Sequence, residues 1–182
     1  LETVTAVGKP VVLVISAGSA LDLSWADAHV AAIIDSFYPG ARGGKAVAEA
    51  IFGDFSPSGK LPVTFYQGTE NLPEFTDYDM SDRTYRYTDK NVLYPFGYGL
   101  HYGTIRYENA QISCAQCSVR DAVDVSVDVI NESSYTIHES VQAYIQHEEA
   151  DAYEPGYQLK GIQTVTLQPK ETKRVTISLK AR

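Results

Sequence analysis

The hydrophobic pattern of this chain changes its period near residue 104, and that change constrains the fold more than any other feature. Before it lies an unbroken run of apolar, mostly β-branched residues, Val11 to Ile15, which is typical of a strand buried on both faces. After it, apolar and polar residues alternate, as in Val123 to Val129, a pattern typical of half-buried antiparallel strands. The sequence therefore predicts an α/β region followed by an all-β region.

The first region has the pattern of a partial α/β domain with a mainly parallel sheet. The turn at Tyr38-Pro39-Gly40 ends the segment before it, and Gly53 is expected to cap a helix. A parallel sheet needs helices on both faces, so we expect this region to expose apolar surface that further protein covers. The expected elements are a helix over 25–32, a strand or a helical extension over 33–37, a helix over 45–52 and a third strand over 61–66.

The second region has the pattern of an antiparallel β-sandwich. A turn is expected at Gln168-Pro169-Lys170-Glu171. A seven-stranded sandwich would need two strands more than the pattern shows. The expected strands are 105–112, 122–130, 138–147, 160–167 and 173–180.

Charge and length exclude several classes of protein. Against 15 Lys and Arg stand 23 Asp and Glu, which gives a net charge of −8. This balance argues against nucleic acid and against a membrane as partners, because both need basic patches. At 182 residues the chain is shorter than a β/α barrel of about 250 residues. Because it starts at Leu1 and its only methionine is Met80, we expect a processed product or an excised piece.

Few motifs in the sequence carry chemistry of their own. The loop from Gly40 to Gly44 opens a helix, and a packing turn is favoured over an anion site because no lysine follows in phosphate-binding register. Cys114 and Cys117 form a lone C-x-x-C without further ligands nearby. For this pair we favour no chemistry, with a local disulfide as the alternative in an exported protein. No histidine pair has metal-ligand spacing, so we expect no metal and no cofactor.

Carboxylates supply candidates for glycosidase chemistry, which needs a pair on either side of the scissile bond. Asp22, Asp54 and the acidic stretch 70–82 provide them by count. Their spacing does not distinguish a catalytic pair from solvated loop charge, and the second interpretation is favoured.

Tyrosines concentrate in one stretch: seven of the 13 lie between residues 78 and 107. Three interpretations remain open. The rings seal an interface between two domains, or they stack on a sugar with Arg83 and Arg86 as hydrogen-bond donors. Alternatively, Tyr98 and Tyr102 belong to the core.

Several strings in order along the chain resemble the C-terminal part of glycoside hydrolase family 3, comprising its α/β domain and its fibronectin-III-like domain. Each string is weak alone, but the ordered series is specific and covers nearly the whole chain. The strings are Phe37 to Gly44, Ile51 to Asp54, Ser58 to Phe65, Arg83 to Tyr87, Leu93 to Tyr102, Leu159 to Gly161 and Val165 to Glu171.

The resemblance implies a retaining, exo-acting β-glycosidase acting on a β-xyloside or β-glucoside. In that family a barrel supplies the aspartate nucleophile, and a loop upstream of the strand at Val11 to Ile15 supplies the glutamate acid/base. No position here matches either motif, so we assign no catalytic residue and expect the isolated chain to be inactive. The string Asp77 to Met80, followed by Arg83 to Tyr87, is more similar to the β-xylosidase branch.

The resemblance also implies an organisation, a site and partners. Residues 1–76 would be the later half of the α/β domain, 77–103 a Tyr-rich connector and 104–182 an incomplete fibronectin-III-like sandwich. Arg83, Tyr85 and Arg86 would bind substrate at the rim of the active site, although a role in joining the domains is an equal alternative. The partners would be a carbohydrate substrate and the missing catalytic barrel domain, in a secreted or periplasmic protein. A non-catalytic carbohydrate-binding or scaffolding module is the second hypothesis.

Overall fold

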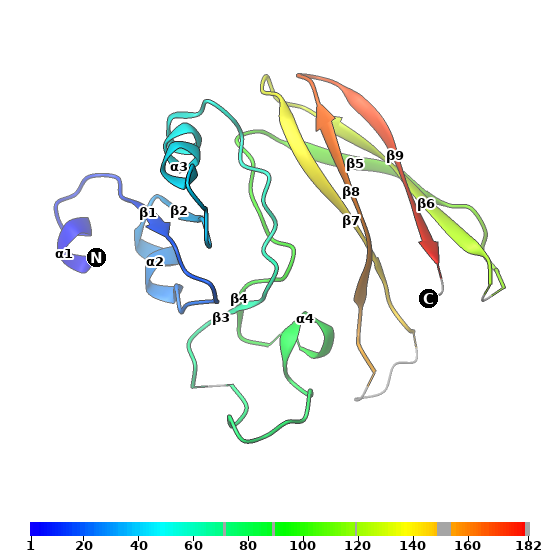
Figure 1. The fold of residues 1–182 in the computed structure, drawn as a ribbon, viewed down its shortest axis with the longest axis horizontal. Helices are drawn as coiled ribbons and strands as arrows, with labels where there is room; N and C mark the ends of the chain where they lie inside the picture. Colours follow the sequence, from blue (N-terminus) through cyan, green and yellow to red (C-terminus); the bar gives the residue numbers. More distant parts are fainter. Residues whose placement is uncertain (71, 89, 119, 149–153, 181–182) are drawn as a thin grey trace. The chain divides into compact units, whose positions relative to one another are not determined.

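The computed structural model of this chain describes residues 1–182 except 71, 89, 119, 149–153 and 181–182. The described chain forms two compact units, which we treat separately. The first comprises Leu1–Phe52 and Leu61–Tyr98, and the second Gly53–Lys60 and Gly99–Arg182. In the order of Figure 1, the elements of the first unit are α1 (Glu2–Thr5), β1 (Val12–Ile15), α2 (Ser24–His29), β2 (Ala32–Asp35), α3 (Gly43–Phe52), β3 (Phe65–Tyr66), α4 (Thr84–Tyr87) and β4 (Val92–Tyr94).

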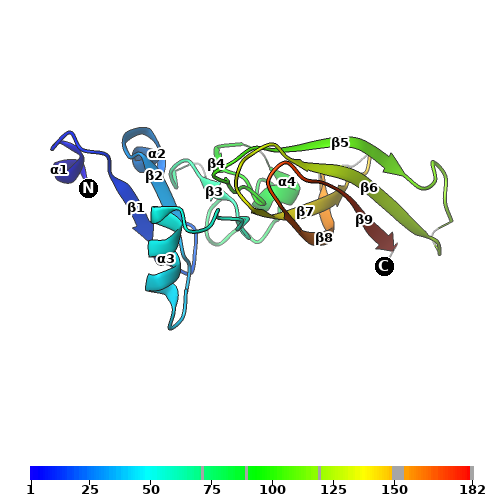
Figure 2. The ribbon, with the colours of Figure 1, turned by 90° about the horizontal axis from the view of Figure 1, so that it is seen from above.

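The first unit is built on a parallel pair of strands. β1 pairs with β2 in the register Val12 to Ala32, so the ambiguous segment after the first long loop is a strand. It is not a helical extension because α2 ends at His29 and Val30 already has extended backbone angles. Figure 1 and Figure 2 both show β1 and β2 lying between α2 and α3, which is the expected α/β layering.

The helix α3 confirms the sequence pattern, although it begins two residues earlier than predicted. It follows the turn at Pro39 and Gly40 and ends before Gly53, whose φ of 80° is the left-handed conformation that favours glycine after a helix. Not all of its apolar side chains are covered by the described chain. Ile51 is exposed and Phe52 is 83% exposed, as expected for a unit with uncovered apolar surface.

The predicted third strand, 61–66, is wrong in length. Only β3, two residues long, is a strand, and it pairs antiparallel with β4 instead of joining β1 and β2. Pro62 lacks the N–H group that a central strand needs. Leu61 nevertheless pairs with the returning chain, because its N–H donates to Tyr98 O at 2.8 Å and its carbonyl accepts from Gly97 N at 2.7 Å.

The second unit is the predicted sandwich of five strands. One sheet has the order β5-β6-β9 and the other is the pair β7-β8. The turn from Gln168 to Glu171 is confirmed by the bond from Glu171 N to Gln168 O. Val129 and Val175 from the first sheet pack with Val141 and Leu167 from the second. The strands are β5 (Ile105–Ile112), β6 (Ala122–Asn131), β7 (Ile137–Ile145), β8 (Gln158–Leu167) and β9 (Thr172–Lys180).

Asn131 ends β6 and is wholly buried. Its Nδ2 donates to the carbonyls of Tyr135, Leu167 and Gln168 at 2.7, 3.3 and 3.0 Å. Its Oδ1 accepts from both the N–H and the hydroxyl of Ser133. One amide thus satisfies the polar groups where three chain segments meet, as burial requires.

Cys114 and Cys117 are joined by a disulfide between β5 and β6. The favoured prediction of no chemistry at this pair is therefore wrong, and the alternative of a local disulfide is right. The short connection between antiparallel strands brings the two sulfur atoms together, which spacing alone does not require.

The units of the structure cut the predicted connector in two. Residues 77–98 belong to the first unit, and 99–103 join 53–60 in the second. The organisation into domains ending at 76 and 103 stays a prediction. Among the described residues, no helix is long and apolar enough to cross a bilayer.

Candidate connector site

The predicted rim residues Arg83, Tyr85 and Arg86 lie on or beside the short helix α4 in the first unit. Tyr85 and Arg86 line a pocket of about 460 Å³. Arg83 does not line it. The other lining residues are Pro62, Val63, Thr64, Tyr66, Met80, Thr84, Tyr87 and Phe96.

Aromatic stacking fixes the wall of this pocket. The rings of Tyr85 and Phe96 stack with centroids 4.1 Å apart and planes 12° from parallel. The guanidinium carbon of Arg86 lies 5.9 Å from the centroid of the Tyr85 ring, within the range of a cation–π contact. The Tyr85 ring is thus held by contacts with both Phe96 and Arg86, and all three residues line the pocket.

Arg83 holds the acidic loop that precedes α4. Its Nε donates to the carbonyl of Asp79 at 3.0 Å. Its Nη2 donates to the carbonyls of Glu74 and Asp77 at 3.0 and 2.7 Å. The described hydrogen bonds of the Arg83 guanidinium thus all go to backbone carbonyls of its own loop. Arg83 therefore acts on the site by fixing the shape of this loop.

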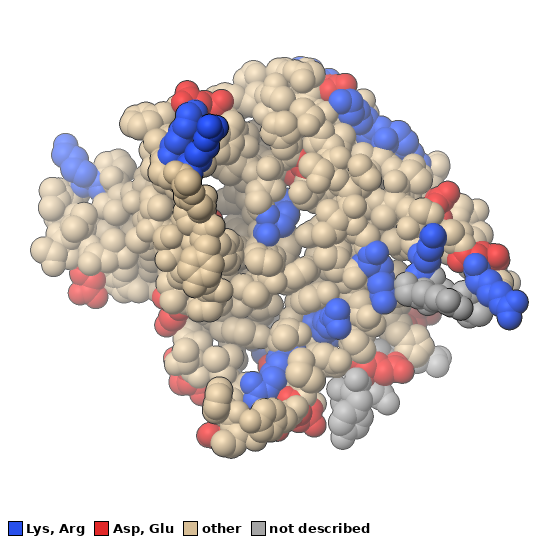
Figure 3. Space-filling view, in the orientation of Figure 1, with Lys and Arg blue, Asp and Glu red and all other residues tan. Residues whose placement is uncertain are grey.

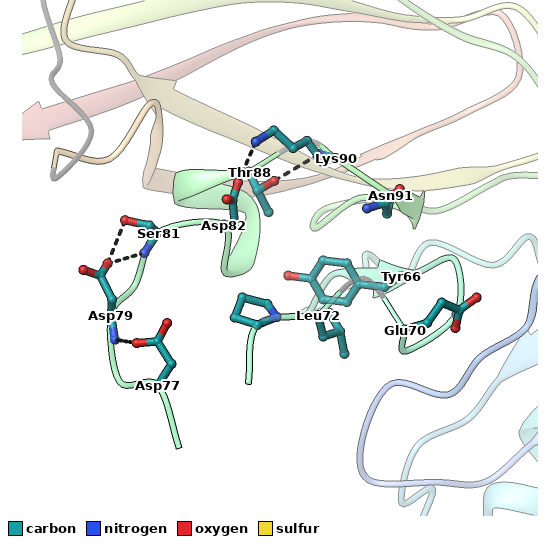
Figure 4. A pocket seen from close by; sticks show the side chains of 12 residues that line it. Tyr66, Glu70, Leu72, Asp77, Asp79, Ser81, Asp82, Thr88, Lys90 and Asn91 are labelled. Carbon is teal, nitrogen blue, oxygen red and sulfur yellow. Dashed lines mark hydrogen bonds and ion pairs between the residues drawn. The ribbon is translucent and has the colours of Figure 1, made fainter. Parts of the chain in front are cut away.

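A second pocket of about 630 Å³ lies along the same loop. Figure 4 shows Asp79 turned toward Ser81, and Lys90 reaching Asp82. Hydrogen bonds from Ser81 lower the pKa of Asp79, so this carboxylate is ionised as a turn former. Figure 3 shows acidic side chains around the loop in the lower part of the view. The lining residues are Tyr66, Gly68, Glu70, Leu72, Pro73, Asp77, Asp79, Ser81, Asp82, Thr88, Lys90 and Asn91.

The acidic side chains of the loop mainly form turns. Asp77 and Asp79 each use Oδ1 to accept a backbone N–H two residues further on, as in Asx turns. Among the described residues, no group of three or more His, Cys, Asp and Glu side chains lies close enough to hold a metal ion. Tyr98 and Tyr102 are both more than a third exposed, so the interpretation of these two as core residues is wrong.

A buried charged cluster in the second unit was missed by the sequence analysis. Glu139 of β7 is 3% exposed. Its Oε1 accepts from the Tyr107 hydroxyl at 2.7 Å and lies 3.3 Å from Lys60 Nζ. Its Oε2 forms an ion pair with His101 Nε2. A signal for it exists: the alternation of Val141 and Ala143 continues backwards to Glu139 and Ile137, and so points a carboxylate into the core.

The environment of Glu139 keeps it ionised. Burial alone would raise the pKa of Glu139, but hydrogen bonds from His101 and Tyr107 and the charge of Lys60 outweigh burial and bring this pKa to about 2. Burial and the hydrogen bond to this carboxylate raise the pKa of Tyr107. The cluster therefore carries charge inside the protein, which is stable only because each group has a partner.

An α/β unit with a parallel strand pair, followed by an antiparallel sandwich, is the architecture of a modular protein. The profile of the glycosyl hydrolase family 3 C-terminal domain matches residues 1–102. That of the fibronectin type III-like domain matches residues 139–182. The chain belongs to glycosyl hydrolase family 3, as the ordered motifs indicated.

Relatives include both kinds of enzyme that the motifs suggested. A xylan 1,4-β-xylosidase of Xylanibacter ruminicola is 37% identical over 179 residues, which are 98% of this chain and 20% of that protein. A periplasmic β-glucosidase of Salmonella typhimurium is 34% identical, over 98% of this chain and 25% of that protein. The solved structure of a β-glucosidase from Erythrobacter marinus matches with a TM-score of 0.84 and 37% identity, over 100% of this chain and 24% of that one. The chain thus spans a fifth to a quarter of these relatives.

Proposed function

We propose that this chain is the C-terminal portion of a retaining, exo-acting β-glycosidase that hydrolyses β-xylosides or β-glucosides. The observation that carries the proposal is the match of nearly the whole chain to only a fifth to a quarter of β-xylosidases and β-glucosidases. Retention requires one carboxylate as nucleophile and a second as acid/base. We assign both to a catalytic barrel domain and an upstream loop outside this sequence, so the chain alone is inactive.

The connector site would meet substrate at the rim of that active site. The Arg86 guanidinium would supply hydrogen-bond donors to a sugar, and the Tyr85–Phe96 stack in the same pocket would supply apolar surface. Arg83 would act through the backbone of the acidic loop that it holds. The sealing of a domain interface by these aromatic side chains is the competing role.

An exported location, secreted or periplasmic, is part of the proposal. The Cys114–Cys117 disulfide supports it, since disulfides persist in oxidising compartments. Charge supports the absence of nucleic acid and membrane partners, because the chain is acidic and such partners need basic patches.

The direct test is an assay on aryl β-xylosides and aryl β-glucosides. We expect no turnover by the 182-residue chain, and turnover with retained anomeric configuration by the polypeptide that its complete reading frame encodes. Turnover by the isolated chain that disappears when one of its own carboxylates is replaced would contradict the proposal.

The rim role is tested in that complete polypeptide with Arg86→Gln and Tyr85→Ala. A raised KM in a protein of unchanged stability supports the rim. Lower stability with unchanged KM and kcat supports the interface role. Phe75→Ala is the matched control, because Phe75 lies on the same loop region but lines neither pocket and is 92% exposed.

A further inference from the structure

The Glu139 cluster draws together three parts of the second unit that lie far apart in sequence. Lys60 ends the segment 53–60, His101 lies in the segment 99–103, and Tyr107 belongs to β5. All three reach the same carboxylate. Since Glu139 itself sits on β7, a single side chain links both irregular segments to the sandwich.

The two irregular segments also hold each other closely. Tyr102 N donates to Ser56 Oγ at 2.9 Å, and Lys60 Nζ donates to the carbonyl of Gly99 at 3.4 Å. A Cβ atom on Gly99 would stand 2.0 Å from the carbonyl oxygen of Gly59. Only glycine permits this approach, so the two segments pack backbone against backbone.

The two segments contribute little to the apolar core of the sandwich. None of the five buried residues of the sandwich core comes from either segment. Phe55, Leu100 and Tyr102 are all exposed by more than a third of their surface. Between these segments and the strands, the structure shows the ion pairs to Glu139 and a close approach of Gly103 to the buried side chain of Ile137.

The two segments lie where the chain passes between the units. The chain passes from one unit to the other after Phe52, after Lys60 and after Tyr98. Each of these passages begins or ends one of the two segments. Whatever fixes the segments to the sandwich therefore fixes every covalent link between the units at its second-unit end.

We propose that Glu139 is an electrostatic anchor for segments 53–60 and 99–103, which detach from the sandwich as a local unit when its charge is removed. The five strands keep their own apolar core and remain folded. Local opening of this kind is expected where attachment is polar and apolar burial is small. Removal of one partner of a buried ion pair is strongly destabilising, because the remaining charge is then buried without a counter-charge.

The test is limited chymotrypsin digestion of the 182-residue chain, with cleavage sites mapped by mass spectrometry. In Glu139→Gln, cleavage after Phe55, Leu100 and Tyr102 should accelerate about tenfold or more, because proteolysis follows the population of the open form. Cleavage after Tyr144 and Leu167, which lie in β7 and β8, should change much less. Glu108→Gln is the matched control, since Glu108 is an exposed β5 carboxylate paired with Arg106.

A second variant approaches the anchor from its partner. Lys60→Met removes one charge and keeps the stem of the side chain, and should accelerate cleavage after Phe55 while leaving the strands resistant. Equal acceleration at all sites in Glu139→Gln, or loss of the whole sandwich, would overturn the proposal, because Glu139 would then support the entire unit. Unchanged cleavage after Phe55, Leu100 and Tyr102 in both variants would overturn it as well.

Discussion

The two units of this chain reach order by different means. Strands in the first unit are two to four residues long, and its core is the small group Ile15, Leu23 and Phe65. Strands in the second are eight to ten residues long, and the β6–β9 ladder runs from Ala122 to Ile130 without a shift in register. Two sheets of long strands can bury their apolar faces against each other, whereas short parallel strands need further layers to bury theirs.

Exposed apolar side chains mark the same difference. Val12 and Val14 on β1 and Ile51 on α3 are each exposed by about 40%. In the sandwich, Val129 and Leu167 are completely buried. Burial of this surface by further chain would therefore stabilise the first unit more than the second. The relatives are four to five times longer than this chain.

The largest change in the stability of one unit alone is expected from a substitution of Phe65, which is 1% exposed. Phe65→Ala should lower the free energy of unfolding of the first unit by about 3 to 5 kcal/mol, because a large side chain leaves a cavity. Trp25 is the only tryptophan and lies in this unit, so its fluorescence follows the transition. We expect the sandwich to unfold as before, and an equal shift of both transitions would contradict the separation of the units.

The converse substitution is Leu167→Ala at the centre of the sandwich core. It should cost the second unit about 2 to 4 kcal/mol and leave the Trp25 signal in place. Far-UV circular dichroism at the β-sheet minimum gives the measurement. The control is Ile162→Ala on the same strand, since Ile162 is 56% exposed and its loss should be small.

Acid should weaken the Glu139 cluster of the second unit. Because the folded-state pKa of Glu139 lies near 2, below its ordinary value of 4.5, its stabilisation is complete above about pH 4.5 and is lost as the pH falls toward 2. The loss should be about 2 to 3 kcal/mol and should fall on the attachment of segments 53–60 and 99–103 to the sandwich. Hydrogen exchange of the backbone amides of these segments at pH 5.5 and 2.5, corrected for the intrinsic exchange rate, measures it, and Glu139→Gln should show a smaller pH dependence than Glu108→Gln.

The smallest effect is expected at the disulfide. Replacing both Cys114 and Cys117 by serine should cost about 2 kcal/mol or less, because the closed loop is very short. The loss should fall on the second unit, leaving the Trp25 transition unchanged. Chemical denaturation with and without a reductant, on the wild-type chain and on the double variant, gives the measurement.

Sequence alone predicted the sandwich well because its signal is local. The alternation in β6 and β9 requires no knowledge of distant residues, and each strand was found within about two residues. The length of β3 was overestimated because the apolar run from Leu61 to Tyr66 contains Pro62. Leu61 itself pairs with the returning chain at Gly97 and Tyr98. That partner depends on tertiary structure.

The candidate site divides in the same way. Arg83, Tyr85 and Arg86 were predicted from a contiguous motif; two of them line one pocket, and their role in binding stays a prediction. The cluster at Glu139 was not found, because Lys60 and His101 reach it from distant segments. Only the register of β7 hinted at a carboxylate facing inward.

The burial of the Asn131 side chain matters when the protein is produced in a cell that attaches N-linked glycans. With Glu132 and Ser133 it forms the triplet Asn-x-Ser, which is the acceptor for N-linked glycans in secretory pathways that attach them. In the folded unit its Nδ2 is wholly buried and donates to three carbonyls. A sugar on that nitrogen and the native fold exclude each other, so any glycan attached there during synthesis would mark a chain that has not reached this structure.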